Sequence, residues 1–184
     1  MSPNIMIESL DPNESSEAVA GLAAVLKDCV EGGASVGFMA PLPVERAADF
    51  WRTVVSGVAA GGRILLVART LPDRRIVGTV QVVSAQPENQ PHRADIAKML
   101  VSPSARRQGI GAMLMRAAEE AARMAGKTIL VLDTVTDGDA ERLYERLGWI
   151  RSGIIPKYAL WPEGGFCDTT VFYRELSGQF EPVR

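Results

Sequence analysis

The chain has 184 residues, of which 47% are apolar and 23% are charged, and its formal net charge is −2. This length favours one globular domain with a sizeable core, and the slightly acidic balance disfavours a nucleic-acid-binding surface. No apolar run reaches the roughly 18 residues of a membrane-spanning helix, and the first residues do not resemble a signal peptide. We therefore expect a cytoplasmic protein without a membrane partner.

Few residues are available for thiol or histidine chemistry. Cys29 and Cys167 fit no metal-ligand spacing and are typical of reduced structural thiols. His92 is the single histidine, which argues against a histidine-rich metal site and against a nucleophile activated by histidine. We expect no metal cofactor.

Apolar residues recur at helical spacing or in short buried-type runs, separated by glycine, proline and polar residues. In chain order we predict a strand over 5–8, helices over 17–30 and 43–60, strands over 63–69, 76–84 and 93–101, a helix over 109–126, a strand over 128–133, a helix over 139–147, and strands over 149–155 and 167–176. The helix over 109–126 joins two buried strands, which implies that these strands are parallel. Loops are predicted over 33–43 and 156–165, and a loose tail is predicted from 177 onward.

The strand over 93–101 should alternate its side chains between the two faces of the sheet. One face would carry Asp95, Ala97, Met99 and Val101, and the other Ile96, Lys98 and Leu100.

The loop that follows this strand is the strongest functional signal. The first N–H groups of the helix that begins near Gly109 have no intrahelical acceptors, and the helix dipole favours an anion there. Gly109 and Gly111 carry no Cβ and allow a ligand to approach the backbone. Arg106 and Arg107 add positive charge. This chemistry predicts a pyrophosphate site.

The segment 106–112 (RRQGIGA) matches the Q/R-x-x-G-x-G/A pattern of the GNAT N-acetyltransferase superfamily. The segment 140–149 (AERLYERLGW) resembles the second signature of that superfamily, a short helix with a Leu-Tyr pair that leads into a Gly-aromatic strand start. The resemblance implies one N-acetyltransferase domain over 1–184, with its core over about 5–176. It also implies an α/β (α+β) fold: a twisted, mixed but mostly antiparallel sheet of about six or seven strands, about four flanking helices and a splayed parallel pair at its centre.

A narrower resemblance is carried by 32–40 (GGASVGFMA) and 132–134 (LDT). These segments are similar to the tabtoxin-resistance branch of the superfamily, whose enzymes acetylate an amino group of a β-lactam amino-acid toxin. The resemblance leaves the acceptor of this protein open.

The resemblance implies transfer of an acetyl group from acetyl-CoA to the primary amine of a small molecule, by direct attack in a ternary complex. The expected cofactor-binding residues are Leu100 and Val101, through backbone groups of the splayed strand; Arg106, Arg107, Gln108, Gly109, Ile110, Gly111 and Ala112, around the pyrophosphate; and Asp137, where many members have asparagine.

For catalysis, Tyr144 matches the tyrosine that protonates the CoA thiolate, and a phenol of pKa near 10 suits that role. Asp133 is expected to act either as the base or as the counter-ion of the acceptor ammonium, since a carboxylate of ordinary pKa is a weak base for an amine. The N–H of Met99 or Leu100 is the candidate oxyanion donor. The expected acceptor-binding residues are Ser35, Phe38, Met39, Trp51, Asp95, Tyr158 and Asp168.

Other functions compete with this interpretation. Within the superfamily, a protein or peptide N-acetyltransferase and a non-catalytic acetyl-CoA-binding regulator are alternatives. A homodimer, common in the superfamily, is left open. A dinucleotide-binding fold is disfavoured, because the loop lacks the third glycine at the required spacing and lies in the middle of the chain.

Overall fold

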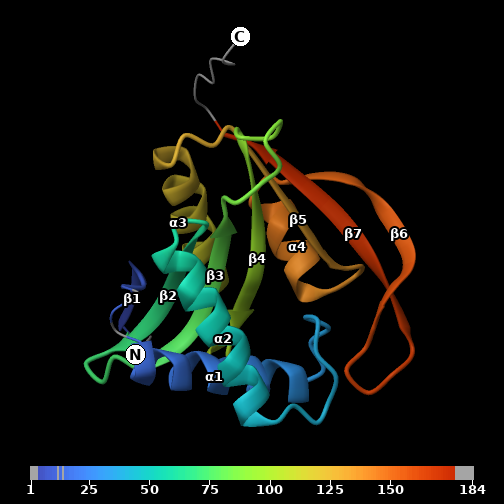
Figure 1. The fold of residues 1–184 in the computed structure, drawn as a ribbon. Helices are drawn as coiled ribbons and strands as arrows, with labels where there is room; N and C mark the ends of the chain where they lie inside the picture. Colours follow the sequence, from blue (N-terminus) through green and yellow to red (C-terminus); the bar gives the residue numbers. More distant parts are fainter. Residues whose placement is uncertain (1–3, 12, 14, 177–184) are drawn as a thin grey trace.

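The computed structural model describes residues 4–11, 13 and 15–176, which form one mixed seven-stranded sheet with helices on both faces (Figure 1). The strands are β1 (Asn4–Ser9), β2 (Arg63–Leu71), β3 (Ile76–Val83), β4 (Arg93–Val101), β5 (Ile129–Val135), β6 (Ile150–Leu160) and β7 (Phe166–Glu175). The helices are α1 (Ser15–Glu31), α2 (Val44–Ala59), α3 (Ile110–Met124) and α4 (Asp139–Arg146), with a 3-10 turn, η1 (Pro103–Ala105), before α3. The tail predicted from residue 177 lies outside the described residues. Within the described residues, no helix is both long and apolar enough to cross a membrane.

The sheet order is β1-β2-β3-β4-β5-β7-β6, and every neighbouring pair is antiparallel except β4 and β5. The parallel pairing joins residues 93–95 of β4 to residues 129–131 of β5. Beyond these residues β4 continues along β3 while β5 continues along β7. The predicted sheet, mostly antiparallel with a splayed parallel pair at its centre, is confirmed.

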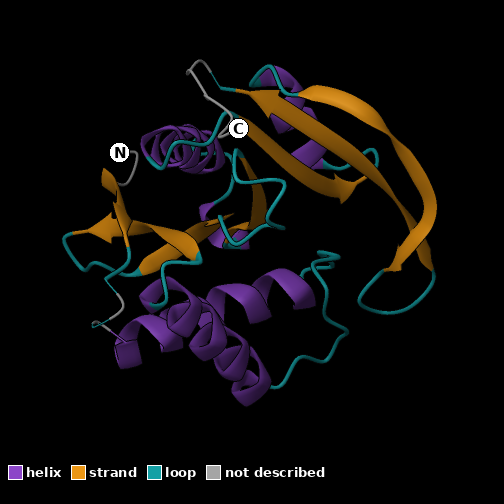
Figure 2. Ribbon diagram, turned by 45° about the horizontal axis from the view of Figure 1, so that its top comes forward, coloured by secondary structure: helices purple, strands orange, loops and turns teal. Residues whose placement is uncertain are grey.

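Two hydrophobic clusters fill the two faces of the sheet, and Figure 2 shows helices on both sides of the strands. On one face, Leu22 and Leu26 of α1 and Trp51 of α2 pack against β2 and β3. On the other face, α3 and α4 pack against the centre of the sheet around Leu114 and Tyr144. The helical spacing of apolar residues therefore predicted which helices cover the sheet.

Strand β4 contains a β-bulge that the sequence analysis did not predict. Thr79 of β3 lies opposite Leu100, but Gln81 lies opposite Ala97, so that the single residue between them faces two residues, Lys98 and Met99. Lys98 has a left-handed backbone conformation, with φ of 49°. A non-glycine residue in this region is strained and is often found at a functional site.

The bulge changes which face the following side chains occupy. Met99 and Val101 lie with Ile96 in the cluster against α3, whereas Leu100 lies in the cluster against α1 and α2. The predicted strict alternation, which placed Ile96 and Leu100 on one face, is therefore wrong. The extra residue at the bulge shifts every later side chain of β4 to the opposite face of the sheet.

The prediction of a loop over 156–165 is also wrong. Strand β6 continues to Leu160 and β7 begins at Phe166, so only residues 161–165 form the turn. Pro156 fits in β6 because β6 is an edge strand, where one side of the backbone needs no partner. The pairing register shifts between Ile155 and Ala159, where a bulge accommodates the proline. The result is a long, curved β6–β7 hairpin at one edge of the sheet (Figure 1).

Candidate active site

A cavity of about 1190 Å³ lies where β4 and β5 separate. Its walls come from both faces of the sheet: the end of α1 and the loop after it, β4, the start of α3, β5, α4 and the β6–β7 hairpin. Among the residues that line it are Ser35, Lys98, Leu100, Val101, Arg106, Arg107, Gly109, Ile110, Gly111, Ala112, Asp133, Tyr144, Tyr158 and Trp161. The cavity therefore passes through the gap in the sheet and gathers predicted residues that are distant in sequence.

The start of α3 forms one end of this cavity. Gly109 is the N-cap residue, with φ of 80°, and the N–H groups of Ile110, Gly111 and Ala112 belong to the first helical turn and have no intrahelical acceptor. A Cβ on Gly111 would lie 3.0 Å from Leu143 Cδ2, so α3 and α4 approach each other closely at this glycine. Gln108, which was predicted to bind the cofactor, is exposed and does not line the cavity.

Arginines surround this end of the cavity. Arg106 Nε donates a hydrogen bond to the Val101 carbonyl (3.3 Å), and Arg107 adopts a left-handed conformation with φ of 62°. Arg116, Arg142 and Arg146 also line the cavity. The sequence analysis missed these three, although they occur in or beside the two recognised motifs. Together they make this end suitable for phosphate groups.

The backbone of Val101 is directed toward the gap between the strands. The N–H of the next residue, Ser102, donates to Val77 on the β3 side (2.8 Å). Alternate residues present their backbone groups to opposite edges of a strand, so Val101 faces β5 and Leu100 faces β3. The Val101 carbonyl accepts bonds from Arg106 and from Cys29 Sγ (3.5 Å). Of the two predicted backbone ligands, Val101 therefore has the better placement.

Asp133 and Tyr144 both line the cavity. Tyr144 is buried, and burial together with the negative charge of Asp133 raises its pKa well above the usual value. Asp133 follows the buried part of β5 and is exposed to the cavity, with Thr169 Oγ1 3.5 Å from its Oδ2. Tyr144 thus keeps its proton over the whole physiological pH range and remains a proton donor.

Lys98 is a cavity residue that the sequence analysis did not select. Its Nζ lies 5.6 Å from the centre of the Phe50 ring. Burial lowers the pKa of this amine, and the charge of Asp133 opposes the decrease. The available signal was a lysine between apolar neighbours on a central strand. The sequence analysis used Lys98 only to assign strand faces and gave it no functional role.

The loop after α1 and the β6–β7 turn close the other end of the cavity. Ser35 Oγ donates to the Leu160 carbonyl (2.7 Å), and Ala40 N donates to the Pro162 carbonyl (2.9 Å). Tyr158 and Trp161 line the cavity beside this contact and are 55% and 40% exposed. Ser35 and Tyr158 are thus located where an acceptor could be bound.

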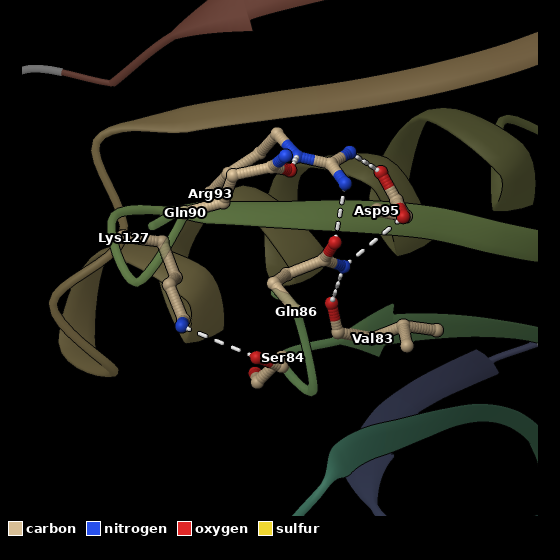
Figure 3. A network of polar contacts seen from close by, with 7 residues as sticks. All are labelled: Val83, Ser84, Gln86, Gln90, Arg93, Asp95 and Lys127. Carbon is tan, nitrogen blue, oxygen red and sulfur yellow. Dashed lines mark hydrogen bonds and ion pairs between the residues drawn. The ribbon is translucent and has the colours of Figure 1, made fainter. Parts of the chain in front are cut away.

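Asp95 does not reach this cavity. It lies at the paired end of β4, where Arg93 forms an ion pair with it and Gln86 Nε2 donates to its Oδ2 (3.0 Å; Figure 3). Gln86 in turn donates to the Val83 carbonyl (3.0 Å), which links this cluster to β3. A structural role therefore replaces the predicted role in substrate binding.

Three predicted acceptor residues on the α1–α2 side are also outside the cavity. Trp51 is 0% exposed and belongs to the core, where it contacts Phe50 edge to face. Phe38 packs on Phe50 with ring centres 5.3 Å apart, and Met39 is exposed. Trp51 and Phe38 pack with Phe50 beside the core, so they support the cavity wall.

Two predicted aspartates are engaged elsewhere. Asp168 Oδ1 accepts the Lys157 N–H (2.8 Å) across the β6–β7 hairpin. Asp137 adopts a left-handed conformation, and its N–H donates to Glu141. Its carbonyl accepts a bond from Arg142 (2.9 Å). Neither side chain lines the cavity.

Comparisons with known proteins agree with this geometry. Residues 37–149 match the model of the acetyltransferase (GNAT) family. An N-acetyltransferase of uncharacterised role, from the hisH-hisA intergenic region of Azospirillum brasilense, is 31% identical over 132 residues, which cover 71% of this chain and 75% of that protein. The chain belongs to the GNAT family and is an N-acetyltransferase.

Solved structures show the same fold. A protein from Salmonella typhimurium described as an acetyltransferase, solved with its cofactor acetyl-CoA, has a TM-score of 0.80 at 18% identity, with 98% of each chain covered. One from Acinetobacter baylyi has a TM-score of 0.83 at 14% identity, with 100% of this chain and 99% of the other covered.

The cavity fits acetyl-CoA. Free N–H groups at the start of α3 and the surrounding arginines suit a pyrophosphate, and the Val101 backbone faces the gap through which the pantetheine arm would pass. Its volume exceeds the roughly 300–1,000 Å³ typical of single-ligand pockets, which leaves room for an acceptor beside the co-substrate. The described residues contain no group of three or more potential metal ligands.

Proposed function

We propose that this enzyme transfers the acetyl group of acetyl-CoA to the primary amine of a small molecule, by direct attack within a ternary complex. The observation that carries the proposal is that Asp133, Tyr144 and the start of α3 line one cavity that passes through the sheet. A co-substrate bound at α3 would present its thioester between these two side chains.

Each step has a candidate group in the chain. The bulge at Lys98 and Met99 interrupts the pairing of β4 with β3, and the Met99 N–H is the candidate donor to the negative charge that develops on the thioester oxygen. Tyr144 donates its proton to the departing thiolate. Asp133 either takes the proton of the acceptor ammonium or holds that ammonium by its charge.

The size of the acceptor follows from the closed end of the cavity. The bonds from Ser35 to Leu160 and from Ala40 to Pro162 hold the loop after α1 against the β6–β7 turn. This contact leaves little space for a polypeptide and favours a small molecule. The segments that resemble the tabtoxin-resistance branch include Ser35 and Asp133, which supports an amino-acid-like toxin or antibiotic as the acceptor.

The test is a ligand and acceptor screen. Calorimetry should detect binding of acetyl-CoA and none of NAD. CoA release should then be followed with 2-phenylethylamine, L-lysine, L-glutamine, the β-lactam amino acid 6-aminopenicillanic acid and a peptide with a free N-terminal alanine. Turnover of a small amine supports the proposal, whereas turnover of the peptide alone would assign a protein or peptide substrate. Binding of acetyl-CoA without CoA release in any arm would indicate a regulator.

A further inference from the structure

Lys98 lies in the cavity, in a position suited to a reactive amine. It sits at the bulge of β4 with a strained backbone, and its side chain extends into the cavity toward the loop after α1. Its Nζ lies 3.8 Å from the position that a Cβ on Gly37 would occupy, and 5.6 Å from the centre of the Phe50 ring. The amine is therefore at the acceptor end of the cavity, against apolar and backbone atoms.

Ionisable groups on three elements share the cavity, or the aromatic pair beneath it, with Lys98. Asp133 of β5 is the carboxylate whose charge acts on the lysine, and Tyr144 of α4 lines the same cavity. Arg46 of α2 lies over Phe38, the other ring of the Phe38–Phe50 pair, 5.8 Å from its centre. Burial thus favours the neutral amine before proton transfer, and Asp133 stabilises the ammonium that forms afterwards.

The reaction requires a base whose pKa is close enough to that of an amine to accept its proton. An acceptor amine is protonated at neutral pH, with a pKa near 10, and a carboxylate with a pKa near 4 accepts its proton very unfavourably. A lysine with a lowered pKa is far better matched, and proton transfer is most efficient when the pKa of the base approaches the working pH.

We propose that the Lys98 amine is the base that takes a proton from the acceptor ammonium while Asp133 holds that ammonium by its charge. The neutral acceptor nitrogen then forms a bond to the acetyl carbon, and the carbon–sulfur bond breaks. Tyr144 protonates the thiolate and is reprotonated by the second proton that the nitrogen loses. Lys98 releases its proton to water, so each turnover yields one acetamide, one CoA thiol and one proton. The inference rests on the proposed function and assigns the base within it.

Two substitutions of Lys98 distinguish a role as a base from a role as a fixed positive charge. Lys98→Arg retains the positive charge but cannot lose its proton, because the guanidinium stays protonated at every pH a folded protein tolerates. Lys98→Met removes both the charge and the titratable proton at similar side-chain length. With the best acceptor of the screen, both variants should lower kcat by about 100-fold at pH 7.5. The loss should shrink toward pH 10, where the acceptor loses its proton without help. Binding of acetyl-CoA should be unchanged by calorimetry.

Lys157 provides a matched control. It is exposed on β6 and has a similar left-handed backbone, with φ of 55°. Lys157→Arg and Lys157→Met should retain the kcat of the wild type. Restored activity in Lys98→Arg but not in Lys98→Met would overturn the inference, because the role would then be one of charge alone.

A second measurement needs no acceptor. Trace labelling of the wild type with acetic anhydride over a pH series, followed by peptide mass spectrometry, reports the fraction of each lysine that is neutral. Lys98 should become reactive at lower pH than Lys157, and at still lower pH in Asp133→Asn. Coincident curves for Lys98 and Lys157 would overturn the inference. A wild type that binds acetyl-CoA but releases no CoA with any amine would instead overturn the proposed function.

Discussion

Asp133 influences two other ionisable side chains of the cavity. It raises the pKa of Tyr144, in addition to the effect of burial, and it opposes the lowering of the Lys98 pKa that burial causes. One carboxylate thus favours a protonated phenol and a protonated amine together. Its removal should therefore shift both groups in the direction of proton loss.

The first prediction concerns Tyr144. Tyr144→Phe removes the proton donor but keeps the ring that packs against Trp149 and Phe172. We expect kcat to fall by about 100-fold while acetyl-CoA affinity is nearly unchanged, measured by steady-state kinetics and calorimetry. A variant with full kcat would remove Tyr144 from the acid role.

The second prediction concerns the stability cost of Lys98. The pKa of this amine is lower in the folded protein than in the unfolded chain, where it is about 10.4, so the unfolded chain binds more protons between the two values. The stability of the fold should therefore rise with pH across that interval. Lys98→Met should raise Tm at pH 7, and the difference should vanish above about pH 10.5. Equal Tm values for both proteins at pH 7 would contradict this.

The third prediction tests whether Trp51 stabilises the core or binds the acceptor. This fully buried ring contacts Phe50, and its Nε1 finds no hydrogen-bond partner among the described residues. Trp51→Ala should lower the free energy of unfolding by about 3–5 kcal/mol. Trp51→Phe keeps an apolar ring and removes the unpaired N–H, so it should cost far less. Denaturant unfolding measures both; an acceptor KM that rises in Trp51→Phe without loss of stability would restore a binding role.

At the scale of elements, the start of α3 offers two glycines with different roles. A Cβ on Gly111 would project into the cavity wall near Leu143, whereas a Cβ on Gly109 would meet no atom within 4 Å but would be strained at φ of 80°. Gly111 therefore leaves space between α3 and α4, whereas Gly109 allows the left-handed backbone that begins α3.

The fourth prediction uses this contrast. Gly111→Ala should weaken acetyl-CoA binding by about tenfold with little net change in stability, because the gain in helix propensity is offset by the shift that the new Cβ, 3.0 Å from Leu143 Cδ2, imposes on Leu143. Gly109→Ala should cost about 1–2 kcal/mol of stability. Calorimetry and thermal unfolding of the two variants give the comparison, and identical behaviour would show that the space at Gly111 is not used.

Most elements could be predicted because their apolar residues follow one period from end to end. The errors arose where a local irregularity interrupts that period. The extra residue at Lys98 reverses the alternation of β4, and Pro156 suggested a loop although an edge strand tolerates it. Composition also could not separate Trp51 in the core from Tyr158 in the cavity, because both are aromatic residues and only packing distinguishes them.

At the scale of the whole molecule, the sheet consists of two parts joined by only three residue pairs of β4 and β5. A co-substrate bound in the gap would contact both parts, and a ligand that binds only the folded state stabilises it.

The fifth prediction follows from this arrangement. Acetyl-CoA at 100 times its Kd should add about 2.7 kcal/mol of stability. Hydrogen exchange should slow on both sides of the gap, in β4 and in β5. Protection confined to β4 and α3 would show that the ligand does not bridge the two parts.

The contact between the loop after α1 and the β6–β7 turn has a kinetic consequence. The gap is bounded by strand pairing at one end and by the Ser35–Leu160 bond at the other, and residues from both faces of the sheet line the cavity. Acetyl-CoA held at α3 and an acceptor held near Tyr158 would then enter from different sides, and neither would block the path of the other. Product-inhibition patterns should therefore be those of random addition, without a compulsory order of binding or release.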